Sequence, residues 1–302
     1  TRMHGTGIVD YGAVSFMPTL GFSADKALPK GAMQGFDKAS ETASPGRYAL
    51  TLNDGIGVEL TATARVGLHR FRFPAGQPAA VLLDLGRTLP DVEVVDATLE
   101  LGPDASTVRG FMHVAGGYSK RSGGVKIYFA AAFSRPPSGH GAWQDGQVVA
   151  DATQRQGQAI GAYFEFAGDD PVVLGVGLSF VDAERAAQNL AAEAPDLDFD
   201  AAQTAAEAAW EAELARVELH GRSERDFEIF YTALYHALLM PTLVSDVDGS
   251  YRGLDQQVHS ADFNYYTDLS LWDTFRTEHP LLTLLYPEYQ VDFLRSLARM
   301  AR

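Results

Sequence analysis

The spacing of apolar residues changes once along this chain, close to Asp182. Before that point the apolar residues alternate or form short runs, as at residues 56–63 and 160–166, and clusters rich in Gly and Pro separate the runs. This pattern is typical of β-strands joined by turns. Beyond Asp182 the apolar residues recur at helical spacing. The sequence therefore predicts a mixed fold, with a large antiparallel β-sandwich followed by helices.

We expect the chain to divide into three parts. These are a β-sandwich domain at residues 1–181, a helical linker at residues 182–221, and the start of a further helical domain at residues 222–302. The linker is rich in alanine, which has the highest helix propensity. A chain of 302 residues is long enough to form two substantial cores.

Several residues mark the expected helix ends. Asp200 is a candidate N-cap for the longer linker helix, and Ser223 with Asp226 has the spacing of a capping box. Arg302 lies inside an amphipathic pattern with no Gly cap or helix breaker near it. We therefore expect the chain to be an excised piece of a longer protein.

Composition argues against several classes of function. The chain has 24 Lys and Arg residues against 39 Asp and Glu residues, a net charge of −15, and the basic residues do not cluster. Nucleic acid is not an expected partner, because phosphate binding needs a basic face. The absence of cysteine rules out disulfides, thiolate metal sites and thiol nucleophiles. No apolar run approaches the roughly 20 residues of a membrane-spanning helix, so no membrane span is expected.

Residues 264–285 hold the highest density of potential site chemistry. Trp272 and Asp273 are adjacent within this segment, and two interpretations are open. In the structural one, Trp272 is a core residue and Asp273 caps a helix. In the functional one, the indole packs on a sugar ring while the carboxylate accepts hydrogen bonds from its hydroxyls.

Other motifs give weaker signals. The run from Asp246 to Gly249 resembles the start of a calcium loop, but an EF-hand would need Glu where Gln257 stands, so a simple turn is favoured. The eight histidines lack the spacing of a metal site, and a structural role is least certain for His4. No P-loop, dinucleotide fingerprint or serine-hydrolase motif is present.

Long runs of the sequence resemble glycoside hydrolase family 92, the calcium-dependent exo-acting α-mannosidases. The matching runs are HGTGIVDYGAVSFMP from residue 4, ASPGRYALTL from residue 43, VELTATARVGLHRFRFP from residue 58, FYTALYHALLMPTLVSDVDGSYRGLDQQVH from residue 230, and NYYTDLSLWDTFRTEHPLLTLLYPE from residue 264. They extend over nearly the whole chain.

This resemblance implies a specific architecture and reaction. The helices after residue 222 would begin an (α/α)6 catalytic barrel, and the intact enzyme would remove terminal α-linked mannose with inversion, in glycan breakdown or N-glycan processing. It would be secreted or periplasmic and would use calcium. In the family, the catalytic acid, the catalytic base and the calcium ligands lie beyond the matched part. We therefore assign no catalytic residue and no metal ligand to this chain, and expect it to bind no calcium and to be inactive alone.

The resemblance also places candidate substrate-binding residues. Family members carry the tryptophan and aspartate of this motif in the wall of the sugar pocket, which favours Trp272 and Asp273. Arg252, Asp255 and His4 are further candidates. The expected partners are mannose-containing glycans, the remainder of the catalytic domain and, through exposed apolar helices, other copies of the chain. The alternative is a non-catalytic carbohydrate-binding or structural module on the same scaffold.

Overall fold

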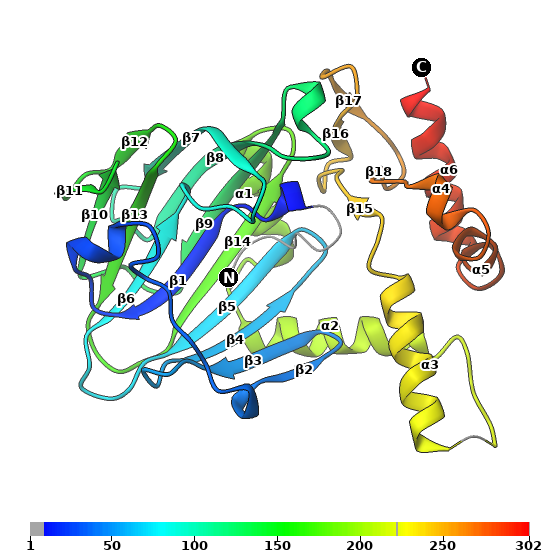
Figure 1. Ribbon diagram of the computed structural model, residues 1–302, viewed down its shortest axis with the longest axis horizontal. Coiled ribbons are helices and arrows are strands. Elements are labelled where there is room, and N and C mark those ends of the chain that lie inside the picture. Colours follow the sequence, from blue (N-terminus) through cyan, green and yellow to red (C-terminus); the bar gives the residue numbers. More distant parts are fainter. Residues whose placement is uncertain (1–8, 222, 302) are drawn as a thin grey trace. The chain divides into compact units, whose positions relative to one another are not determined.

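The computed structural model describes residues 9–221 and 223–301 and divides into two compact units. The division falls between Gln203 and Thr204, inside helix α2 (Phe199–Leu214). We call the part before it the sandwich unit and the part after it the helical unit (Figure 1).

The sandwich unit contains two antiparallel sheets, which confirms the predicted sandwich. The five-stranded sheet has, in spatial order, strands β1 (Ser15–Leu20), β6 (Ala79–Asp84), β13 (Ile160–Phe166), β10 (Gly139–Gln144) and β11 (Gln147–Ala150). The nine-stranded sheet has β12 (Gln154–Gln156), β7 (Glu93–Leu101), β8 (Thr107–Ala115), β9 (Val125–Phe133), β14 (Val172–Ser179), β5 (Val66–Arg72), β4 (Gly57–Ala62), β3 (Arg47–Thr51) and β2 (Thr42–Ser44). In the part of the chain that the structure describes, short 3₁₀ helices lie in the loops: η1 (Val9–Tyr11), η2 (Ala24–Ala27), η3 (Lys38–Ser40) and η4 (Lys120–Ser122).

Alternation along the strands builds the core between the two sheets. On β9, Ile127, Phe129, Ala131 and Phe133 face this core, and the alternate residues, such as Tyr128, turn to the opposite face of the sheet. Phe133 of the nine-stranded sheet lies 4.7 Å, centroid to centroid, from Phe164 of the five-stranded sheet. Because both rings are apolar and dry, this contact helps to hold the sheets face to face.

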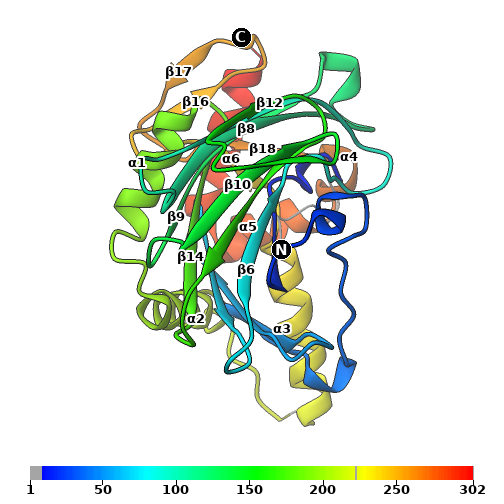
Figure 2. The same ribbon diagram turned by 90° about the vertical axis from the view of Figure 1, so that its left-hand side faces the viewer.

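Helix α1 (Ala183–Glu193) packs on the outer face of the nine-stranded sheet, along β14 and β9 (Figure 2). Asp182 caps it by accepting a hydrogen bond from the Arg185 backbone N–H at 2.8 Å. Gly177 of β14 permits the close approach, since a Cβ there would lie 2.3 Å from the Ala186 carbonyl oxygen. The change to helix near Asp182 is therefore where the sequence predicts it.

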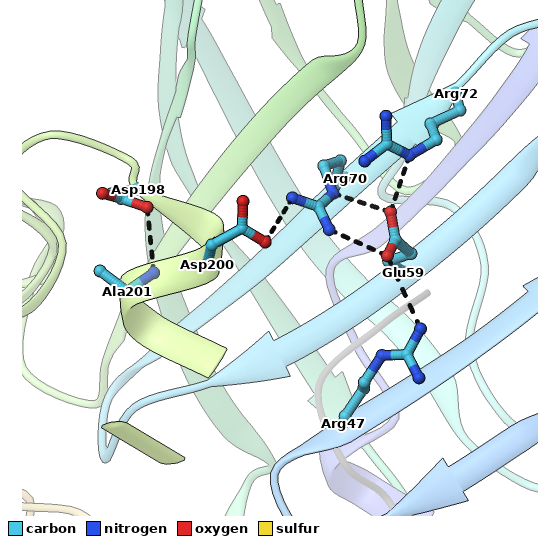
Figure 3. A network of polar contacts seen from close by, with 7 residues as sticks. All are labelled: Arg47, Glu59, Arg70, Arg72, Asp198, Asp200 and Ala201. Atoms are coloured by element: carbon cyan, nitrogen blue, oxygen red, sulfur yellow. Dashed lines mark hydrogen bonds and ion pairs between the residues drawn. The ribbon is translucent and has the colours of Figure 1, made fainter. Parts of the chain in front are cut away.

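The first turn of α2 is fastened to the sheet by charged side chains (Figure 3). Arg70 donates to Glu59 through Nε at 2.7 Å and Nη2 at 2.9 Å, and to Asp200 through Nη1 at 2.7 Å. Arg72 also donates to Glu59 at 3.0 Å. Hydrogen bonding from Arg70, followed by that from Arg72, lowers the pKa of Glu59 to about 2. Arg70 of β5 thus links the ionised Glu59 of β4 to Asp200 of the helix.

Asp200 is not the N-cap that the sequence predicts. The carboxylate of Asp198 accepts from the Ala201 backbone N–H at 3.0 Å, so the helix begins at Phe199. Asp200 instead lies in the first turn and pairs with Arg70. An acidic residue is favourable at either position, because both lie at the positive end of the helix dipole.

The helical unit contains the rest of α2 with α3 (Glu224–Ala237), α4 (Leu271–Thr274), α5 (Glu278–Leu285) and α6 (Pro287–Met300). Two short antiparallel pairs lie between α3 and α4. They are β15 (Thr242–Leu243) with β18 (Tyr266–Thr267), and β16 (Ser250–Arg252) with β17 (Val258–Ser260). The predicted capping box is confirmed, because Ser223 and Asp226 hydrogen-bond each other's backbone N–H. The (α/α)6 barrel stays a prediction.

The core of the helical unit is small. Its buried apolar members are Leu234, Tyr266, Leu282, Tyr286 and Phe293. The Tyr266 backbone N–H donates to the Ser296 hydroxyl at 3.0 Å, which ties β18 to α6. Among the described residues, no helix is long and apolar enough to cross a membrane.

Candidate functional site

Helix α4 presents the tryptophan and aspartate singled out in the sequence. It is four residues long, with Ser270 at the N-cap and Asp273 inside its first turn. The Ser270 hydroxyl donates to Asp273 Oδ2 at 2.5 Å. The prediction that Asp273 caps a helix is therefore wrong, because Ser270 occupies that position.

Trp272 is 88% exposed and is not a core residue. Its neighbours Leu271 and Phe275 are also exposed, at 44% and 51%. The structural interpretation of a buried indole is contradicted. An indole on the surface beside a carboxylate offers an apolar face and hydrogen-bond acceptors in one place.

Arg252 and Asp255 lie on the β16–β17 hairpin, and both make contacts that stabilise its turn. Asp255 accepts from the Gln257 backbone N–H at 3.0 Å and approaches His259 Nε2 at 2.9 Å. The hydrogen bond from Gln257, with a further contribution from His259, lowers the pKa of Asp255. Arg252 Nη1 donates to the Gln256 carbonyl at 2.8 Å. Both residues thus make contacts within this hairpin, and their role in substrate binding stays a prediction.

The candidates fall on two elements and one undescribed segment. Trp272 and Asp273 are neighbours on α4, and Arg252 and Asp255 share the hairpin. His4 lies outside the described residues. The segment from Asp246 to Gly249 is a turn as predicted, closed by the Gly249 N–H donating to the Asp246 carbonyl at 2.9 Å.

Sequence reasoning missed a polar group at the start of α5. Glu278 is half-buried there, and burial raises the pKa of its carboxyl group. The neighbouring His279 contacts Gln290 of α6 through Nδ1 at 3.0 Å. Raised carboxyl pKa values occur at acid–base sites as well as at structural ones. The sequence shows Glu278 and His279 as neighbours, but it does not reveal that Gln290 of α6 contacts them through His279.

Sequence reasoning also missed an aromatic stack beneath the hairpin. The rings of Tyr251 and Tyr265 lie 3.8 Å apart at 18°, and both residues are buried. Burial raises the pKa of the Tyr265 hydroxyl to about 12, so it stays protonated at neutral pH. The stack supports the hairpin rather than offering a surface to a ligand.

Metal ligands are not grouped in this chain as far as the structure describes it. Within residues 9–221 and 223–301, no set of three or more His, Asp or Glu side chains is placed to hold a metal ion. Calcium prefers six to eight oxygen ligands, among which grouped carboxylates are typical. These residues do not fit a calcium site, and we assign no chemical step to a metal bound by them.

Two family models together match almost the whole chain. Residues 1–179 match the glycosyl hydrolase family 92 N-terminal domain, and residues 185–302 match the family 92 catalytic domain. The chain belongs to glycosyl hydrolase family 92. Its catalytic-domain match begins within α1, whereas contacts in the structure group α1 with the sandwich unit. The part of this chain that matches the catalytic domain therefore includes most of a helix that packs on the sandwich.

Solved structures of family 92 share this fold. An α-mannosidase from Bacteroides thetaiotaomicron, BT3965, is 31% identical with a TM-score of 0.89, over 99% of this chain and 42% of its own. The inverting mannosidase BT2199 from Bacteroides thetaiotaomicron VPI-5482 is 28% identical with a TM-score of 0.83, over 94% of this chain and 38% of its own. The chain thus spans about two fifths of the length of these family 92 structures.

A curated relative in another organism also matches. A protein of Arthroderma benhamiae described as an uncharacterized secreted glycosidase is 28% identical over 229 residues. The matched part is 67% of this chain and 29% of that protein. Family 92 membership therefore rests on sequence and structure together.

Proposed function

We propose that the intact protein hydrolyses terminal α-linked mannose in glycans with inversion, and that Trp272 and Asp273 bind the sugar. Support comes from the 31% identity to an α-mannosidase across 99% of this chain. A further structure of that relative is described as a complex with mannoimidazole. A second relative is described as an inverting mannosidase.

The observation that carries the proposal is the exposed Trp272 beside Asp273. Leaving an indole 88% exposed forgoes apolar burial of roughly 2 kcal/mol or more. A sugar ring placed against it would recover part of that energy through its C–H face. Asp273 is held by Ser270, and an ionised carboxylate has about four acceptor positions, so it can still accept from sugar hydroxyls.

The reaction chemistry is assigned to the rest of the intact protein. An inverting glycosidase needs two carboxyl groups about 6.5–9.5 Å apart, one as acid and one as base. We name neither from this chain. We propose that calcium is bound outside these residues and that the intact protein is secreted, like the relative described as a secreted glycosidase. In this proposal the present residues bind and orient the substrate.

Mannose release by the intact protein tests the proposal. Proton NMR during hydrolysis of an α-linked mannobiose should show β-mannose first, because inversion reverses the anomeric configuration. Trp272→Ala should lower kcat/KM about ten-fold or more. The matched control is Phe275→Ala, an exposed aromatic from the same segment, which should leave kcat/KM nearly unchanged. Binding of mannosides without hydrolysis would instead support the non-catalytic module.

A further inference from the structure

A second surface whose side chains could complement a sugar lies on the outer face of the nine-stranded sheet. It is a groove of about 580 Å³ over β12, β7, β8 and β9, bordered by Gln144 of β10 and by Ala183 at the start of α1. Alternation along β8 explains the exposure, because Val108 and Met112 point into the core while Arg109 and Phe111 point outward. We call this surface the outer groove.

The floor of the outer groove is aromatic. Phe111 and Tyr128 are direct cross-strand partners on β8 and β9, with ring centroids 5.7 Å apart at 56°. Thr98 of β7 and Gln156 of β12 continue the same row across the sheet. Both rings are only half-buried, so part of each faces the groove. Such a platform suits the apolar face of a pyranose ring.

The rim of the outer groove offers amides. Gln144, Gln154 and Gln156 are exposed and contribute to its lining. Each amide has both donor and acceptor atoms, which matches hydroxyl groups that donate and accept in turn. Gln156 Nε2 donates to Asp96 Oδ2 at 3.2 Å, which helps to orient that amide.

Charged groups around the groove are already engaged. Arg109 pairs with Glu100 at 3.0 Å, and Arg155 Nη1 donates to the Gln154 carbonyl at 2.7 Å. Lys126 Nζ lies 5.0 Å from the centroid of the Phe111 ring. Because each cation has a partner here, an anionic ligand such as a phosphate would have to displace these contacts. The surface favours a neutral, hydroxyl-rich ligand.

The supporting sheet makes the platform rigid. Strands β7, β8 and β9 are nine residues long and pair over their length, apart from one irregularity between Val94 and Asp96. Gly110 allows β7 and β8 to approach closely, because a Cβ there would lie 1.9 Å from the Thr98 carbonyl oxygen. A preformed platform loses little conformational freedom on binding.

We propose that the outer groove is a non-catalytic binding site for a neutral oligosaccharide, separate from the Trp272–Asp273 pair. The choice of a mannose-containing chain as its ligand rests on the proposed function. A site of this kind would hold a glycan on the sandwich unit while its terminal residue is removed elsewhere.

Isothermal titration of the 302-residue chain with an α-linked mannotetraose tests the proposal. The wild-type chain should bind saturably with a Kd below about 1 mM. Tyr128→Ala should weaken binding about ten-fold. The double variant Gln154→Ala with Gln156→Ala should weaken it similarly, and both positions are exposed, so the sheet should fold normally. Circular dichroism checks the fold of each variant.

Two controls separate this inference from the proposed function. Tyr118→Ala, which removes an exposed aromatic from another loop, should leave binding unchanged. Trp272→Ala should leave the groove binding in place. If the wild-type chain does not bind the oligosaccharide, or if only Trp272→Ala abolishes binding, the outer groove is not a binding site. Either result would leave the proposed function unaffected. Groove binding in an intact protein that releases no mannose would support the groove and overturn the proposed function.

Discussion

The two units differ in how well they bury their apolar residues. In the sandwich unit one core extends through both sheets, and Phe16, Phe71, Phe129 and Phe164 are essentially inaccessible. Among the described residues of the helical unit, the main buried cluster has five apolar residues, Val244, Tyr251 and Tyr265 are buried apart from it, and Leu284 is 78% exposed. Further exposed apolar side chains of this unit are Ile229, Val247, Leu254, Val258, Leu271, Trp272, Phe275, Val291 and Leu294.

This difference matters most for the surface of the helical unit. Single exposed apolar residues are ordinary, but several on short helices create faces that favour association. The exposed Trp272 belongs to the same unit as these faces. The sandwich unit buries most of its large apolar side chains between its sheets, whereas the helical unit keeps several of them at its surface. Self-association stays a prediction.

Removing an aromatic ring from the core should produce the largest difference in stability change between the two units. Phe129→Ala should lower the free energy of unfolding of the sandwich unit by about 3–5 kcal/mol, because it leaves a cavity between the sheets. Leu284→Ala, at an exposed position of the helical unit, should change stability by less than about 0.5 kcal/mol. Urea denaturation followed by circular dichroism measures both. Equal losses would remove the distinction between the two units.

The Glu59 network should give the next largest effect. Glu59→Gln should destabilise the sandwich unit by about 2–4 kcal/mol, because the largely buried Arg70 would lose both hydrogen bonds to Glu59 and keep only Asp200 as a carboxylate partner. Glu93→Gln is the matched control, since its ion pair with Lys120 is exposed and should contribute under about 1 kcal/mol. Thermal unfolding of both variants tests this, and equal shifts would count against the network.

The same network predicts how stability depends on pH. The pKa of Glu59 is about 2 in the folded chain, below its ordinary value of 4.5. Its contribution is therefore complete above about pH 4.5 and is lost as the pH falls through 2. The stability advantage of the wild-type chain over Glu59→Gln should shrink across that window. An advantage that stays constant from pH 5 to pH 2 would contradict the lowered pKa.

Breaking the capping box should give a smaller effect, confined to the helical unit. Ser223→Ala removes the side chain that accepts from the Asp226 backbone N–H, and should cost about 1 kcal/mol. Hydrogen exchange should rise in α3 and stay unchanged in β9, if the units open independently. Equal changes in both elements would show that the units unfold together.

Substitutions on the exposed helix faces should have the smallest effect on stability and the largest effect on self-association. Leu284→Ser with Leu294→Ser should leave the melting temperature nearly unchanged, because both side chains face solvent. Sedimentation velocity of the 302-residue chain should show less self-association in this variant than in wild type. Unchanged association would place the contact elsewhere.

The sequence predicted the architecture better than the positions of single side chains. Alternation in strands such as β13 is a local signal, and it located the sandwich correctly. The N-cap assignments for Asp200 and Asp273 were wrong, because an acidic residue is favoured throughout a first helical turn. The exposure of Trp272 was open in the sequence, because the same pattern suits a core residue or a ligand contact.

Contacts between residues far apart in the chain could not be predicted from the sequence. Arg70 and Asp200 are 130 positions apart, and nothing local marks them as partners. The outer groove likewise depends on strand register, which places Phe111 opposite Tyr128. Register follows from the whole sheet, so a single strand does not reveal it.

The most direct test of the sugar-binding role is Asp273→Ala in the intact protein, with kcat/KM and melting temperature measured on the same preparation. If the carboxylate accepts hydrogen bonds from substrate hydroxyls, its removal should lower kcat/KM by about ten-fold to more than a hundred-fold. The melting temperature should change little, because the hydrogen bond from Ser270 is exposed. An unchanged kcat/KM beside a lowered melting temperature would make Asp273 a structural residue and contradict the proposed site.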